Sequence, residues 1–135
     1  MSAMRGRPEM HLHGDIPVVK VEGDWDEATG LSLTELITSL VSAGHVEIIV
    51  NLTRMTGSSL SDRIWLDALE RIAATVRAHF GRLDVVASLE QITRSVCKRA
   101  SSRFFWATSE EEAVGHIKGL TVFRAGPILT SRYVG

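Results

Sequence analysis

The sequence predicts a single small α/β domain in which amphipathic helices pack against a mixed β-sheet. Strand-length and helix-length hydrophobic segments alternate along the chain, and the strongest strand has three consecutive apolar residues, Ile-Ile-Val, at its centre. Such a run indicates burial on both faces, as in parallel or mixed sheets. Alternating strands and helices imply right-handed crossovers, with the helices packed on the sheet.

The strands are predicted from short runs of β-branched and other apolar residues. Residues 16–22, 45–52 and 83–87 give three strands, and the last two have the composition of buried strands. Residues 10–13 are a candidate partner for the first of them, and residues 104–106 are a candidate edge strand.

Four helices are predicted, at residues 26–44, 61–80, 90–100 and 108–117. The first three carry apolar residues at three- and four-residue spacing, and the fourth opens with Thr-Ser-Glu-Glu-Glu, which favours a helix start. Gly44 occupies the C-terminal cap position of the first helix. A loop at residues 53–59 precedes the second helix, whose inward-facing residues are expected to be Ile64, Trp65, Leu69, Ile72, Ala73 and Val76.

The chain is expected to consist of a flexible leader at residues 1–9, one domain at 10–118 and a C-terminal extension at 119–135. Its 135 residues fit one domain with one core. A net charge of −1 lacks the basic footprint of nucleic-acid-binding proteins. No apolar segment is long enough for a signal peptide or a membrane span, and Cys97 is the single cysteine. We therefore expect a cytoplasmic protein without an intrachain disulfide.

The serine-rich turn at residues 56–61, Thr-Gly-Ser-Ser-Leu-Ser, is the strongest candidate for the working part of the chain. It precedes a predicted helix, whose first N–H groups lack intrahelical partners and favour negative charge, including phosphate. A phosphate on a serine there would change docking to any partner. Ser59 and Asp62 also fit a capping pattern, so the serines alternatively act only as helix caps.

Three segments in order resemble the STAS domain of bacterial anti-sigma factor antagonists. Residues 18–25 (Val-Val-Lys-Val-Glu-Gly-Asp-Trp) are similar to the opening strand, and residues 47–53 (Glu-Ile-Ile-Val-Asn-Leu-Thr) to the central strand of that family. Residues 104–114 resemble its phenylalanine-rich last strand and acidic helix. The resemblance implies a STAS-like fold and a regulatory role in partner switching. The partner that it implies is a serine-kinase anti-sigma factor with a histidine-kinase-like ATPase fold.

The phosphorylation motif of that family, Asp-Ser-Ser/Thr-Gly-Leu, is degenerate here. One alignment register places the phosphorylated hydroxyl at Ser61 and the other at Ser59, and neither register supplies both the Asp and the Gly. The alternative is a non-phosphorylated STAS module that acts as a scaffold or binds a small ligand. The resemblance implies a partner-binding surface formed by Thr56, Gly57, Ser58, Ser59, Leu60, Ser61, Asp62 and Trp65.

Other candidate sites give weaker signals. His11 and His13 share one face of a strand and form at most half of a metal site. Cys97 lies on the inner side of its predicted helix and is interpreted as a buried structural thiol. Gly-Ser-Ser is not a Gly-x-Ser-x-Gly nucleophile elbow. The sequence therefore predicts no metal, no cofactor and no enzyme, although a catalytic pocket lined by His45, Asp62 or Ser61 is a third hypothesis. Pairing as a homodimer is left open.

Overall fold

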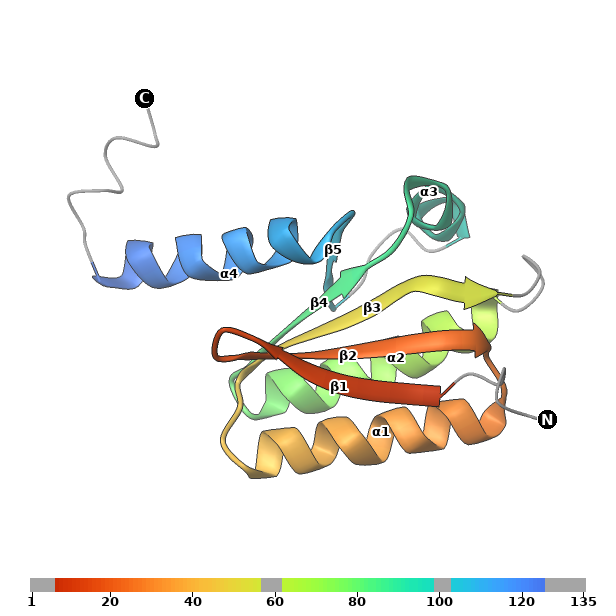
Figure 1. Ribbon diagram of the computed structural model, residues 1–135, viewed down its shortest axis with the longest axis horizontal. Helices are drawn as coiled ribbons and strands as arrows, with labels where there is room; N and C mark the ends of the chain where they lie inside the picture. The colour runs from red at the N-terminus through yellow and green to blue at the C-terminus, as the bar shows by residue number, and fades with distance from the viewer. Residues whose placement is uncertain (1–6, 57–61, 99–102, 126–135) are drawn as a thin grey trace.

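The described part of the chain forms a five-stranded sheet with four helices. The structure, a computed structural model, describes residues 7–56, 62–98 and 103–125. The strands lie in the order β1-β2-β3-β4-β5; β1 is antiparallel to β2, and the remaining pairs are parallel. The elements are β1 (Arg7–His13), β2 (Ile16–Asp24), α1 (Glu27–Ser42), β3 (Glu47–Thr56), α2 (Asp62–Ala78), β4 (Arg82–Val86), α3 (Leu89–Lys98), β5 (Phe105–Ala107) and α4 (Glu110–Ala125) (Figure 1).

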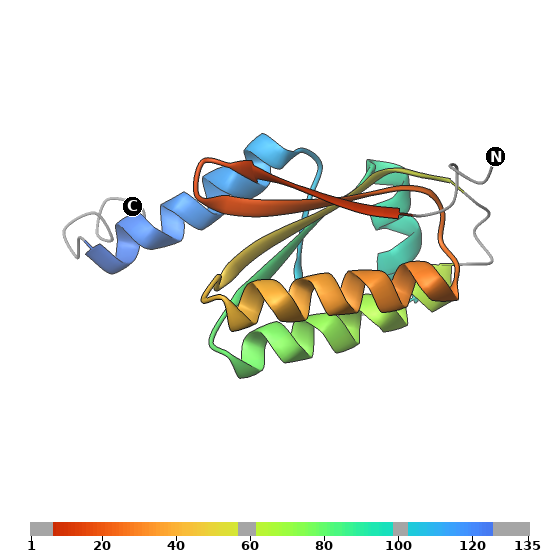
Figure 2. The same cartoon turned by 60° about the horizontal axis from the view of Figure 1, so that its bottom comes forward.

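Helices cover both faces of this sheet. In Figures 1 and 2, α1 and α2 run side by side along one face, and α4 lies on the other. The larger core lies between the sheet and the α1–α2 pair; its members include Val19, Val50, Leu52, Trp65 and Leu69. The smaller core lies toward α4 and contains Ile16, Val18, Ile49, Val86, Ala107, Ala113, Val114 and Ile117.

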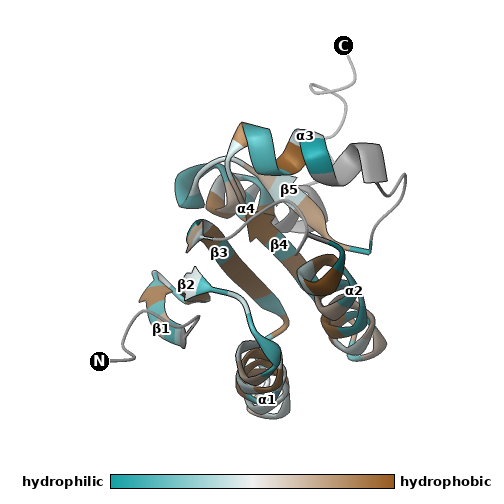
Figure 3. Cartoon of the chain, turned by 90° about the vertical axis from the view of Figure 1, so that its right-hand side faces the viewer, coloured by the Kyte–Doolittle hydropathy of each residue, from teal (hydrophilic) through white to brown (hydrophobic). Residues whose placement is uncertain are grey.

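The central strand β3 divides its side chains between the two cores. Ile48, Val50 and Leu52 belong to the larger core, whereas Ile49 belongs to the smaller one. This alternation follows from the two-residue period of a strand. The predicted burial of this strand on both faces is therefore confirmed, and Figure 3 shows β3 and β4 as apolar ribbons between the two helix layers.

The helix ends show how the chain reverses direction. At the start of α1, Thr29 N–H donates to the Asp26 carboxylate (2.8 Å), and Asp26 N–H donates to the Thr29 hydroxyl (3.3 Å). At its end, Gly44 has φ of +100°, and His45 N–H reaches the Leu40 carbonyl at 3.0 Å. This is a Schellman cap with glycine at the left-handed position, as predicted for Gly44.

The end of α2 has the same cap with an unusual residue in it. Phe80 adopts φ of +62°, where glycine is usual, and its side chain is 95% exposed. The glycine is one residue later, because a Cβ atom on Gly81 would lie 2.5 Å from the Val46 carbonyl oxygen. The close approach of the chain at position 81 to Val46 therefore requires glycine there. The left-handed position of the cap is one residue earlier and is occupied by Phe80.

Several predicted boundaries differ from the observed ones. The first strand begins at Arg7, within the expected leader, because its residues pair with β2 as far as Glu22. Residues 53–56 were expected in a loop but extend β3, since Arg54, Met55 and Thr56 pair with the end of β2. Helix α4 continues to Ala125, into the expected C-terminal extension.

Within the three described ranges, no helix is both long enough and apolar enough to cross a bilayer.

Candidate functional site

Strands β2 and β3 end side by side at the edge from which α1 and α2 begin. Asp24 pairs with Thr56 in the register of the two parallel strands, and the Thr56 hydroxyl donates a hydrogen bond to the Asp24 carboxylate. Both residues are exposed. The carboxyl ends of parallel strands are where ligands bind in open α/β sheets. We call this region, formed by residues 24–27, 54–56 and 62–64, the serine-turn end.

The serine-rich turn itself connects two described anchor points. Thr56 is the last residue of β3, and Asp62 is the first residue of α2. Gly57, Ser58, Ser59, Leu60 and Ser61 lie outside the described residues, as does the side chain of Asp62. The prediction that these residues bind a partner, with Ser59 or Ser61 as phosphoacceptor, therefore stays a prediction.

Trp65 was predicted to belong to the partner-binding surface, but the structure buries it. Its side chain is 1% exposed and lies in the larger core. Trp65, Leu69, Ile72, Ala73 and Val76 form the inner stripe of α2, as the helical spacing predicted. Ile64 was also expected to face inward, but it is 59% exposed, because adjacent helical residues point about 100° apart.

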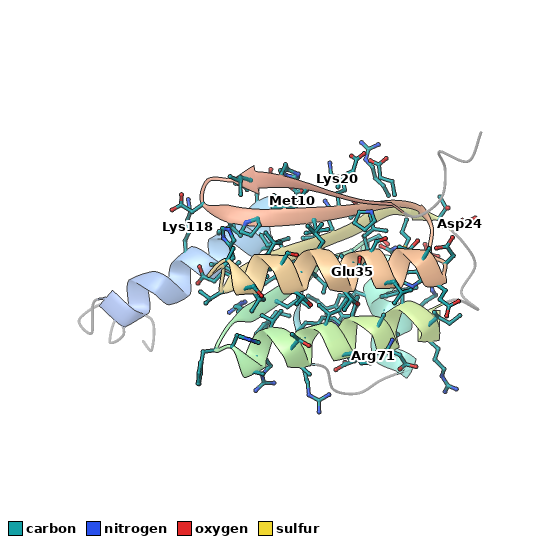
Figure 4. All side chains as sticks on the ribbon, turned by 90° about the horizontal axis from the view of Figure 1, so that it is seen from below. Met10, Lys20, Asp24, Glu35, Arg71 and Lys118 are labelled. Carbon is teal, nitrogen blue, oxygen red and sulfur yellow. The ribbon has the colours of Figure 1, made fainter. Side chains whose placement is uncertain are left out.

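A groove runs between the first halves of α1 and α2, beside the serine-turn end. Its volume is about 570 Å³. Trp25, 9% exposed, helps to line it, and α1 packs against the indole at Gly30, where an added Cβ atom would make only an ordinary contact at 3.7 Å. Leu31 (62% exposed) and Ile64 also line the groove. Figure 4 views this face with Asp24, Glu35 and Arg71 labelled. The groove is further lined by Ala68, Thr34, Asp26, Glu27 and Arg71.

A polar network on the opposite face of the sheet was not predicted from the sequence. Asn51 is 7% exposed, and its amide donates to Glu110 Oε2 at 2.7 Å. The Asn51 amide oxygen accepts from the Thr53 N–H (2.9 Å) and hydroxyl (2.7 Å). The only sequence signal was an amide side chain within an otherwise apolar strand. The sequence did not indicate its partner, because Glu110 is 59 residues away.

Glu110 links three elements through this network. His11 Nε2 lies 3.2 Å from Glu110 Oε1, and His13 Nδ1 lies 3.9 Å from the same oxygen, so the predicted sharing of one face by the two histidines is confirmed. Partial burial raises the pKa of Glu110, but hydrogen bonds from Asn51 and His11 and the charges of His11 and Lys20 outweigh it. The pKa of Glu110 therefore lies below its ordinary value. Among the described side chains, no group of three or more His, Cys, Asp or Glu has an arrangement suited to a metal ion.

His45 and Asp62, two residues of the hypothetical catalytic pocket, lie far apart in the chain's fold. His45 precedes the first residue of β3, whereas Ser61 and Asp62 follow its last residue in the chain. A strand of ten residues spans roughly 33 Å at about 3.3 Å per residue. His45 therefore lies at the opposite end of the sheet from the start of α2 and cannot share one pocket with it.

Comparison with solved structures identifies the architecture. The crystal structure of an anti-sigma factor antagonist from Mycobacterium paratuberculosis matches with a TM-score of 0.68 and 18% identity, covering 87% of this chain and 97% of that chain. The protein has the STAS fold. The anti-sigma factor antagonist SpoIIAA in its unphosphorylated form matches with a TM-score of 0.60 and 16% identity, over 84% of this chain and 99% of that chain. Sequence comparison gives no matching family model and no matching curated protein.

The STAS fold confirms the predicted α/β class, with a mixed sheet and helices packed against it. It also confirms the structural part of the resemblance that three separate segments indicated. These two structural matches establish the fold. Because the sequence identity is below one fifth, function has to be argued from the site.

Proposed function

We propose that this chain is a regulatory protein that binds an anti-sigma factor through its serine-turn end. The observation that carries the proposal is the match to nearly the full length of an anti-sigma factor antagonist, 97% of that chain. The exposed Asp24–Thr56 pair supports the location, since it places an accessible strand end beside a helix start. Regulation by binding requires such an accessible surface on a rigid scaffold.

The proposed partner is a serine-kinase anti-sigma factor with a histidine-kinase-like ATPase fold, in the cytoplasm. The proposed contact residues are those of the predicted surface without Trp65, because Trp65 is buried. Ser59 and Ser61 are the proposed phosphoacceptors. A phosphate on either would add about 1.5 to 2 negative charges next to the helix start, and those charges would change the fit of an already docked partner.

The test is incubation of the purified chain with the serine-kinase anti-sigma factor of its source cell and ATP, followed by peptide mass spectrometry. We expect phosphate on Ser59 or Ser61, lost in the corresponding Ser→Ala variant. Ser39→Ala, an exposed serine of α1, is the matched control and should leave phosphorylation unchanged. Binding without phosphate on either serine would contradict the phosphorylation part alone.

A second candidate function is a scaffold or small-ligand module without phosphorylation. It is favoured by the turn sequence, which lacks the Asp and Gly of the family motif. In that case, the double variant Ser59→Ala/Ser61→Ala would bind its partner with unchanged affinity. Ser59→Asp and Ser61→Asp would likewise imitate no regulated state in a partner-binding titration.

A further inference from the structure

We propose that two copies of this chain join through β1, the two strands pairing antiparallel about His11 so that the two sheets become one. Strand β1 lies at one edge of the sheet, and none of the other described strands pairs with its outer side. Figure 3 shows it at the far side of the sheet from β5. The inference does not rest on the proposed function, because β1 takes no part in the serine-turn end.

The edge formed by β1 lacks the usual protection against strand pairing. It has seven residues, whereas β5 at the other edge has three. Proteins commonly protect an edge strand by shortness, by proline or lysine, or by a bulge. Residues 9–13, Glu-Met-His-Leu-His, contain neither proline nor lysine, and their pairing with β2 has no register shift. This edge is therefore a template to which another strand can add.

The register of β1 on β2 shows which backbone groups face the open edge. In an antiparallel ladder, pairs that exchange two hydrogen bonds alternate with pairs that exchange none. Leu12 pairs with Pro17, which has no N–H, so this pair is of the second kind. Met10, two residues earlier, has the same position in the alternation. The N–H and C=O groups of Met10 and Leu12 therefore point away from β2.

The side chains of β1 complement those of a second, antiparallel β1. Pairing centred on His11 places Met10 opposite Leu12 of the second copy, and Glu9 opposite its His13. Met10 and Leu12 are 45% and 58% exposed, so both are free to pack across the new ladder. Glu9 and His13 lie on the other face of the strand, where the carboxylate can accept a hydrogen bond from the imidazole. Apolar pairs and acid–histidine pairs directly opposite one another stabilise a ladder.

The prolines of β1 and β2 favour this register over its neighbour. Centred on His11, the two Met10–Leu12 pairs each exchange both hydrogen bonds, and Pro8 lies outside them. Centred on Met10 instead, Leu12 would pair with Pro8 of the second copy, and each such pair would lack one bond. Both sides of the contact belong to this chain, which favours a second copy over a different protein.

The first experiment is sedimentation equilibrium of the full chain over a range of concentrations. We expect a monomer–dimer equilibrium whose Kd rises by about tenfold or more in Leu12→Lys, because a charge replaces an apolar contact at the paired edge. Leu31→Lys is the matched control, since it adds the same charge to a similarly exposed leucine of α1 (62%). The control should dimerise with a Kd within about twofold of wild type.

Leu12→Pro tests the backbone part of the contact. This change removes an N–H that faces the open edge and that β2 does not use. We expect the variant to stay folded by circular dichroism and to lose dimerisation by about tenfold or more.

Disulfide cross-linking tests the register in a Cys97→Ser background, which removes the single native cysteine. His11 lies on the two-fold axis of the proposed dimer, where the two Cα atoms are about 4.5 Å apart, a separation that a disulfide spans. His11→Cys should therefore form a cross-linked dimer under mild oxidation. Glu9→Cys is the control: its two copies lie roughly 14 Å apart along the ladder, and they should not cross-link.

Four outcomes overturn the proposal and leave the proposed function standing. The first is a chain that is monomeric at every concentration, and the second is a dimer that Leu12→Lys and Leu12→Pro leave intact. The third is cross-linking of Glu9→Cys without cross-linking of His11→Cys. The fourth is a monomer whose Leu12→Pro variant no longer binds the anti-sigma factor, because the edge then belongs to that partner.

Discussion

The two faces of the sheet are held to their helices by different means. The α1–α2 face has a continuous apolar core, in which Trp65, Leu69 and Leu33 are essentially inaccessible. The α4 face has a smaller apolar core supplemented by the polar network of Asn51, Glu110 and His11. The first is dominated by apolar burial, and its helix pair borders the groove. The second adds matched polar groups from β1, β3 and α4 to a smaller apolar core.

The largest effect is expected in the apolar core. Trp65→Ala should lower the free energy of unfolding by about 3–5 kcal/mol, because it removes a fully buried indole and leaves a cavity. Ile64→Ala, the exposed neighbour, should cost less than about 1 kcal/mol. Urea unfolding measures both. If both variants lost the same free energy of unfolding, the burial of Trp65 in the core would be contradicted.

The next effect tests the polar network. Asn51→Leu keeps the branching and the number of heavy atoms of the side chain but removes the hydrogen bonds to Glu110 and from Thr53. We expect a loss of about 1–3 kcal/mol in the free energy of unfolding, since a largely buried carboxylate oxygen loses its donor. Unchanged stability in urea would contradict a stabilising role for the Asn51 network.

The network also predicts a pH dependence. Because the pKa of Glu110 is lower in the folded chain than its ordinary value of 4.5, the ionised carboxylate stabilises the folded state. This contribution is fully present above the ordinary pKa and is lost as the pH falls through the folded value. Compared with wild type, Glu110→Gln should flatten the acid limb of stability against pH, whereas the exposed Glu111→Gln should not. Parallel acid limbs for Glu110→Gln and wild type would contradict the lowered pKa.

The smallest effect concerns the end of α2. Phe80→Gly should raise the free energy of unfolding by about 0.5 kcal/mol. Glycine removes the strain of a left-handed side-chain-bearing residue, and this gain slightly exceeds the cost of the extra backbone entropy that glycine has in the unfolded chain. Gly81→Ala is the opposite control and should destabilise the chain, since its Cβ would meet the Val46 carbonyl. Thermal unfolding of the two variants should therefore shift in opposite directions.

The sequence predicted the α1–α2 face better than the α4 face for a physical reason. Helical spacing reports burial on a single element, and it correctly placed Trp65, Leu69 and Ile72 inside. It could not separate Ile64 from its neighbour at the edge of the apolar stripe. It also could not pair Asn51 with Glu110, because that contact depends on how α4 crosses the sheet.

The candidate site followed from the sequence only in outline. The position of the turn between the central strand and the second helix was predicted, and the structure confirms both flanking elements. The groove was not predicted, since it requires knowing that the starts of α1 and α2 lie side by side. The extension of β3 to Thr56 was missed as well, because residues 53–56 form strand through pairing with β2 and not through composition.

The most direct test of the central claim is hydrogen exchange of the chain with and without the serine-kinase anti-sigma factor. We expect protection at the serine-turn end, in residues 54–56 and 62–66, and no change at the opposite end around Gly44 and Phe80. Protection confined to the opposite end, or none at all with a partner that demonstrably binds, would contradict the account.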